Sequence, residues 1–305
     1  MPKWNGSVVI WPNRILFAGE AAQSELHDSH TLMICVAFGG KLSLQLSRGG
    51  SWDPFTAVII DSETLHCIDG LEAKFVALIH LLPETEEARK LKRKYLAGRG
   101  VHEIPERLAE KLLAYRKTLE DFWLLDCETA GEICGGIIGK LIKSPSTRLD
   151  RDVEYHVRRA IKELYWRMDE KLKNGPAYED NSTASSVVNK LRLDEKGWTE
   201  ETLKRELKKN TGATFDEYVK LLRFRATLVK IARNEAELRA APGQSKISGK
   251  KTKQLREISL TEAASWMGWG ELYNLTRAST AILGINPSSL KDSSRFIECE
   301  ENSGQ

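Results

Sequence analysis

Three histidines are the first residues in the sequence whose chemistry could serve a function. His27 and His30 precede one expected strand, and His66 follows another. Imidazoles bind metals, but a protein site needs about three or four convergent ligands, commonly with a carboxylate among them. No carboxylate stands at a matching spacing here. Turn and surface positions are therefore the favoured interpretation, and we expect neither a metal nor another cofactor.

Cysteine usage and hydropathy exclude several classes of protein. The five cysteines are an odd count without a C-x-x-C pair, which argues against a disulfide framework and a closed zinc site and fits a reducing compartment. No stretch approaches the roughly 20 apolar residues of a membrane span, and no apolar leader opens the chain. A nucleophile motif, a phosphate-binding glycine loop and a carboxylate pair are also missing. We expect a cytoplasmic protein that is not an enzyme and does not bind a membrane.

Basic side chains are concentrated in one block of a nearly neutral chain. The 305 residues carry 46 Lys and Arg against 43 Asp and Glu. Residues 185–258 alone hold 18 basic and 10 acidic side chains. A localised basic block is typical of a modular protein that binds a polyanion such as DNA. The alternative is an ordinary solvated helical surface.

The elements expected to position these basic residues are two pairs of helices. In the first pair, Thr199 is a suitable N-cap, Leu203 and Leu207 form an apolar stripe, and Gly212 can adopt the left-handed conformation that ends a helix. A second helix is expected over residues 216–230, and the supporting helix before this pair is expected near residues 185–193.

The second pair of helices has clearer boundaries. Ser259 and Glu262 form a capping box that opens a helix. Gly268 stands where a tight turn needs a small residue with permissive φ, and Trp269 follows as an expected core residue. A second helix is predicted over residues 271–283. Two short helices joined by a tight glycine turn are typical of a DNA-reading element.

These residues resemble the DNA-binding domain of the AraC/XylS family of transcription regulators, over roughly residues 153–291. The matching residues of the second half are Ser259, Leu260, Glu262, Ala263, Ala264, Gly268, Trp269, Arg277, Gly284 and Pro287. Those of the first half are Leu203, Leu207, Gly212, Phe215, Tyr218, Leu222 and Arg223. The resemblance implies two helix-turn-helix units on one connecting helix, each placing its second helix in the major groove of double-stranded DNA. The basic stretch of residues 239–252 departs from the family's short connection.

Outward positions on the two reading helices are the expected DNA contacts, because these side chains reach base edges and phosphates. They are Thr202, Lys204, Arg205 and Lys208 in the first unit, and Glu271, Tyr273, Asn274 and Arg277 in the second. The second unit carries no net charge, so we expect it to add less to affinity than the first.

The N-terminal half has short apolar strands followed by helical segments, so the fold class is α+β. Glycine-containing turns separate the strands and predict a sandwich or barrel. In the AraC/XylS family a cupin-type barrel commonly occupies this position, and His27 to His30 and Asp61 to His66 resemble remnants of its two motifs. We therefore expect a cupin-like sensor domain over residues 1–145, a DNA-binding domain over residues 150–291 and a flexible acidic tail over residues 292–305.

The sensor domain is expected to receive an effector, either a small molecule or a protein. An apolar pocket would be lined by Trp11, Phe17, Phe38, Ile60 and Phe75, although a filled core is the more frequent role of such residues. Residues 108–125 and 133–142 could form a homodimer interface or pack on their own barrel. The functional alternative to a regulator is a cupin-type metal-dependent enzyme with a helical appendage. Activation and repression are not distinguished by the sequence.

Overall fold

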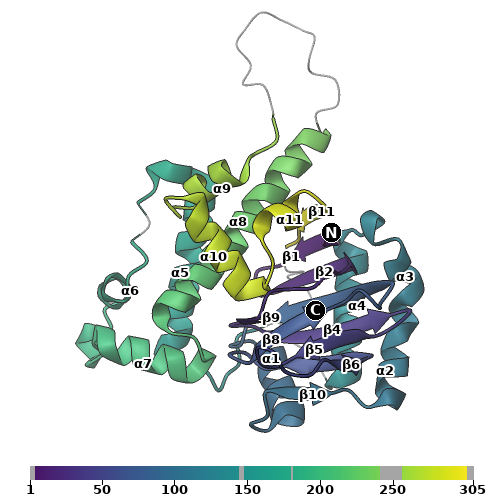
Figure 1. Ribbon diagram of the computed structural model, residues 1–305. Coiled ribbons are helices and arrows are strands. Elements are labelled where there is room, and N and C mark those ends of the chain that lie inside the picture. Colours follow the sequence, from purple (N-terminus) through teal and green to yellow (C-terminus); the bar gives the residue numbers. More distant parts are fainter. Residues whose placement is uncertain (1–3, 144–147, 180, 241–255, 301–305) are drawn as a thin grey trace, which may run out of the picture.

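The computed structural model describes residues 4–143, 148–179, 181–240 and 256–300, and it confirms the α+β class (Figure 1). In the view of Figure 1, two sheets with their covering helices occupy the right and a group of helices occupies the left. Among the described residues, no helix is long and apolar enough to cross a lipid bilayer.

The strands pair into a seven-stranded sheet and a four-stranded sheet. The larger has the order β10-β7-β4-β9-β2-β1-β11, and the smaller has the order β3-β8-β5-β6. The strands are β1 (Asn5–Ile10), β2 (Arg14–Glu20), β3 (His27–Asp28), β4 (Leu32–Phe38), β5 (Leu42–Gln45), β6 (Asp53–Phe55), β7 (Ala57–Ile60), β8 (Leu65–Asp69), β9 (Phe75–Leu81), β10 (Val101–Glu103) and β11 (Ser294–Glu298). Strand β4 is buried along its whole length, because apolar groups cover both of its faces.

Short helices cover one face of the larger sheet. They are α1 (Glu86–Leu91), α2 (Glu106–Leu112), α3 (Arg116–Glu120) and α4 (Cys127–Leu141). Between Glu106 and Leu124 the chain forms α2 and α3 together with single turns of tighter helix. Leu112, Leu119 and Ile137 of these helices are fully buried in one cluster with the sheet. The segments proposed for a dimer interface thus bury their apolar stripe on their own sheet.

The remaining helices form a second layer of the molecule. They are α5 (Tyr155–Asn174), α6 (Ala184–Lys190), α7 (Glu200–Thr211), α8 (Phe215–Ala240), α9 (Leu260–Trp266), α10 (Leu272–Leu283) and α11 (Pro287–Lys291). Helix α8 continues ten residues past the expected end at Lys230, to Ala240. Most of the predicted basic linker, residues 241–252, lies outside the described residues.

The segment expected to be a flexible acidic tail contains a strand. β11 pairs in parallel with β1 and becomes an edge strand of the larger sheet, with Val8 opposite Phe296. Phe296 is buried, and the Arg233 guanidinium on α8 binds both carboxylate oxygens of Glu298 at 2.6 Å. The expectation of a free tail is therefore wrong for residues 294–298, because alternation around a single buried phenylalanine gives only a weak sequence signal.

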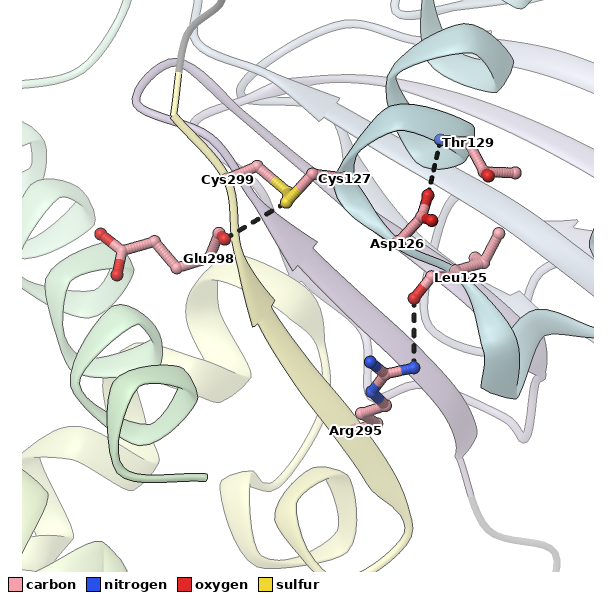
Figure 2. The surroundings of a disulfide bond; sticks show 7 residues. All are labelled: Leu125, Asp126, Cys127, Thr129, Arg295, Glu298 and Cys299. Atoms are coloured by element: carbon pink, nitrogen blue, oxygen red, sulfur yellow. Dashed lines mark hydrogen bonds between the residues drawn. A yellow bond between two sulfur atoms is a disulfide. The ribbon is translucent and has the colours of Figure 1, made fainter. Parts of the chain in front are cut away.

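A disulfide joins the end of this strand to the sheet domain. Cys127 at the start of α4 is bonded to Cys299, at a sequence separation of 172 (Figure 2). Beside it, the Arg295 guanidinium donates to the carbonyl oxygen of Leu125 at 3.1 Å (Figure 2). The argument against a disulfide framework missed this bond, because two cysteines so far apart leave no spacing pattern in the sequence.

Candidate nucleic-acid interface

The first helix-turn-helix unit consists of the supporting helix α6 and the reading helix α7, and the helix expected over residues 216–230 is part of the connecting helix α8. The Thr199 hydroxyl accepts a hydrogen bond from the backbone NH of Thr202, which confirms the predicted N-cap of α7. Leu203 and Leu207 are fully buried. Gly212 ends the helix with φ of 86°, in the region that favours glycine. Helix α6 packs against α7 and begins at Ala184, one residue before the expected supporting helix.

The outward face of α7 carries two exposed cations from the predicted set. Arg205 and Lys208 lie opposite the buried leucine stripe and are exposed. Among the described residues, Arg205 forms an ion pair only with its neighbour Glu206, at 3.3 Å, and Lys208 forms none. Lys204 is different, because its ammonium lies 2.6 Å from Glu200, whose carboxylate raises the pKa of the lysine.

The remaining predicted residue of α7 and its two leading carboxylates lie in the first turn of the helix. Thr202 is half-buried, and its hydroxyl lies 3.1 Å from that of the N-cap Thr199. Glu200 and Glu201 occupy the first turn, where carboxylates stabilise the positive end of the helix. Arg205 and Lys208 are therefore the most exposed cations among the residues predicted on α7.

The second unit consists of α9 and α10. Ser259 and Glu262 form the predicted capping box at the start of α9. Gly268 has φ of 77° in the turn. Trp269 is buried, and its indole NH donates to the Thr227 hydroxyl of α8 at 2.9 Å. The tryptophan therefore fixes the turn of the second unit to the middle of α8.

The four side chains predicted to contact DNA in the second unit are all exposed, but they differ in how far they are engaged by other groups of the protein. Tyr273 is 63% exposed, and the Arg277 guanidinium lies 5.8 Å from the centre of its ring. The side-chain amide of Asn274 donates to the carbonyl oxygen of Trp269 at 2.9 Å and so supports the turn. Glu271 is the residue before α10 and caps it without a side-chain hydrogen bond. Tyr273 and Arg277 are consequently the more available side chains.

Helix α8 connects both units and also contacts the sheet domain. The Tyr218 hydroxyl donates to Glu84 at 2.6 Å, and the Arg225 guanidinium donates to the carbonyl oxygen of Trp11 at 2.9 Å. Both donors are buried. A buried polar group is costly to separate from its partner, so these contacts resist sliding of α8 on the sheets.

The residues predicted to line an effector pocket do not surround one cavity. Phe17 and Ile60 belong to the core between the sheets and the helical layer. Trp11, Phe38 and Phe75 belong to the core on the other face of the larger sheet, under α2 to α4. All five are buried. The separation follows from the pleat of the strands, whose successive side chains point to opposite faces.

Of the three histidines named from the sequence, His27 and His66 are buried and His30 is half-buried. The ring centres of His27 and His66 lie 4.3 Å apart on paired strands. The Nδ1 of His30 instead forms a hydrogen bond of 2.6 Å with a carboxylate oxygen of Glu63. His80, which sequence reasoning missed, lies near them, and burial lowers the pKa of His66 and of His80 to about 3. Among the described residues, no group of three metal-binding side chains could hold an ion. His27 and His66 are thus not the turn and surface residues that the sequence favoured.

The chain is similar in architecture to several solved structures at low sequence identity. ToxT from Vibrio cholerae has 12% identity and a TM-score of 0.47, with 90% of this chain and 95% of ToxT covered. ToxT with an unsaturated fatty acid bound has 12% identity and a TM-score of 0.43, covering 94% of this chain and 96% of ToxT. The AraC-like transcriptional activator CuxR has 12% identity and a TM-score of 0.30, covering 75% of this chain and 74% of CuxR. No family model matches the sequence, and no curated protein matches it significantly.

Proposed function

We propose that this chain is a transcription regulator of the AraC/XylS type that binds double-stranded DNA through two helix-turn-helix units. The observation that carries the proposal is the pair of capped two-helix units that pack on α8, each with exposed side chains on the outward face of its second helix. Arg205 and Lys208 supply cations on α7, and Tyr273 and Arg277 supply an aromatic and a cationic group on α10. Such groups on a helix that enters the major groove contact bases and phosphates.

The sheet domain is proposed to control this DNA binding. Its buried contacts with α8, from Glu84 to Tyr218 and from Trp11 to Arg225, join it directly to the helix that carries both units. A ligand, either a small molecule or a protein, that favours one arrangement of this junction would change the DNA affinity by the difference of its own affinities for the two arrangements. Homodimer formation through the sheet domain also stays a proposal.

An electrophoretic mobility-shift assay tests the proposal. The probe is the region upstream of the chain's own gene, with a shuffled fragment as competitor, and the salt concentration is varied. Wild-type protein should prefer the upstream fragment. The double variant Arg205→Ala/Lys208→Ala should lower the affinity, with a slope of log K against log salt that is shallower by up to about 2 because each lost phosphate contact removes roughly 0.9.

The matched control removes two cations far from both units. Lys111 on α2 and Lys117 on α3 are exposed, so Lys111→Ala/Lys117→Ala makes the same change in net charge. This control should leave affinity and salt slope close to those of the wild type. Equal losses of DNA affinity in both double variants would mean that the α7 substitutions act only through the net charge of the protein. No preference for the upstream fragment at any salt concentration would overturn sequence-specific binding to it.

A further inference from the structure

A cleft of about 790 Å³ lies between the sheet domain and α5, and the proposed DNA contacts do not use it. Asn13 and Glu84 line it from the sheet domain, and Arg151 lines it from the segment before α5. Arg158, Lys162 and further residues of α5 form the opposite wall. The volume falls within the range of roughly 300–1,000 Å³ that is usual for small-molecule sites.

The charge of the cleft favours an anionic ligand. Five basic residues line it, and the acidic residues in its wall are Glu84 and Asp169. The described residues offer no carboxylate partner to Arg151, Arg158 or Lys162, and the Nε of Arg158 is buried without a hydrogen-bond acceptor. Cations outnumber acidic residues in this wall, so an anion bound between them would be stabilised.

Aromatic side chains stand beside these cations. Tyr155 and Trp166 line the cleft and are 58% and 48% exposed, which is unusual for large apolar side chains on a helix whose other face is buried. The Arg159 guanidinium lies 6.0 Å from the centre of the Tyr155 ring. The wall can therefore cover the planar apolar part of a ligand while cations meet its acidic group.

Glu84 adds a buried polar atom at the base of the cleft. Its side chain is fully buried, and one carboxylate oxygen accepts the Tyr218 hydrogen bond. The Tyr165 hydroxyl also favours the charged form of this carboxyl. Desolvation raises the pKa of Glu84 to about 7.

We propose that this cleft binds a small organic anion that joins an acidic group to a planar apolar ring. The acidic group binds Arg158 and Lys162, and the ring packs against Tyr155 and Trp166. A ligand held in this way touches both the sheet domain and α5, so its binding favours one placement of the helical layer on the sheets. This regulatory consequence rests on the proposed function, whereas the binding site itself does not.

Fluorescence titration with two related dyes tests the site on the full chain. Anilinonaphthalene sulfonate carries a sulfonate on an aromatic body, and phenylnaphthylamine is its neutral counterpart. Wild-type protein should bind the anionic dye saturably at one site. The variant Arg158→Glu/Lys162→Glu should weaken this binding by about tenfold or more, which corresponds to 1.4 kcal/mol, and should change binding of the neutral dye much less.

The control for this titration is Lys111→Glu/Lys117→Glu, which reverses the same number of charges on exposed helical positions. Unchanged dye affinity in the cleft variant, or an equal loss in the control, would overturn the proposed site. If charge reversal abolishes the native circular dichroism spectrum, Arg158→Gln/Lys162→Gln replaces it and should still weaken the anionic dye severalfold.

Two DNA measurements separate this site from the proposed function. Displacement of the anionic dye by shuffled DNA as readily as by the upstream fragment would mean that the cleft is a phosphate-binding surface, which overturns the small-molecule site. Saturable dye binding in a protein that shows no DNA preference would remove the proposed function and leave the site standing. No saturable dye binding in a protein that still recognises its DNA would remove the proposed site and leave the proposed function standing.

Discussion

At the scale of single residues, Glu84 links stability to pH. Desolvation raises the pKa of this buried carboxyl from 4.5 to about 7, although the hydrogen bond from Tyr218 favours the charged form. Between these pH values the unfolded chain releases a proton that the folded chain keeps. The contribution of the neutral carboxyl to stability is therefore complete below pH 4.5 and is lost as the pH rises through about 7.

The variant Glu84→Gln should remove this dependence, because glutamine can still accept from Tyr218 but does not titrate. From about pH 5 to 7.5 the wild type should lose stability relative to the variant, by an amount on the order of 2–3 kcal/mol. Urea unfolding at several pH values measures the difference. The buried histidines are common to both proteins and cancel in the comparison. Parallel stability curves for the two proteins would contradict the assigned shift.

At the scale of elements, Trp269 connects the second helix-turn-helix unit to α8. Replacing this buried side chain with alanine should cost about 3–5 kcal/mol of unfolding free energy, because a large cavity remains. Trp269→Phe should cost less, since it keeps most of the apolar contact and loses the hydrogen bond to Thr227. In a double-mutant cycle by chemical denaturation, Trp269→Phe and Thr227→Val should be non-additive by about 1 kcal/mol. Additive losses would mean that the bond contributes nothing.

The disulfide gives a second prediction for an element, the strand β11. Under denaturing conditions without reductant, thiol titration should find three free thiols, those of Cys35, Cys67 and Cys134, and after reduction it should find all five. Reduction opens the loop that the disulfide closes across a sequence separation of 172, and the unfolded chain gains conformational entropy. The chain-entropy model therefore predicts that reduction lowers the free energy of unfolding by about 5 kcal/mol. The ladder to β1 and the Glu298 ion pair should still hold the strand. Five free thiols before reduction would contradict the bond.

The elements of this chain were predictable where a local pattern specifies them. The N-cap Thr199, the capping box at Ser259 and the turn at Gly268 all lie within a few residues of the groups they bind, so the sequence shows them. Strand β11 and the bond to Cys127 depend on partners more than a hundred residues away, and no local pattern reports such contacts.

The candidate sites were predictable to different degrees for the same reason. Helical periodicity placed Arg205 and Lys208 on the outward face of α7 correctly. It could not show that the amide of Asn274 is engaged with the turn, since that contact depends on the fold of the loop. The cleft at α5 combines Glu84 with Arg158, and only the packing of two layers brings these residues together.

At the scale of the whole molecule, the near-neutral net charge conceals a division between two layers. The basic excess of residues 185–258 belongs to the first unit, α8 and the segment that follows it. Residues 259–291 of the second unit hold two basic and two acidic side chains. We therefore expect the DNA affinity to come mainly from α7 and its surroundings. Tyr273 and Arg277 of α10 should contribute the position of the protein on the DNA and the sequence preference.

The most direct test of the central claim is hydroxyl-radical footprinting on the DNA sequence that the full chain selects from a random pool. Two units on one helix predict two protected windows on the same face of the duplex, about one helical turn apart. Arg205→Ala/Lys208→Ala should weaken both windows, and Tyr273→Ala/Arg277→Ala should remove one of them. No enriched sequence, or a footprint that both double variants leave unchanged, would contradict the account.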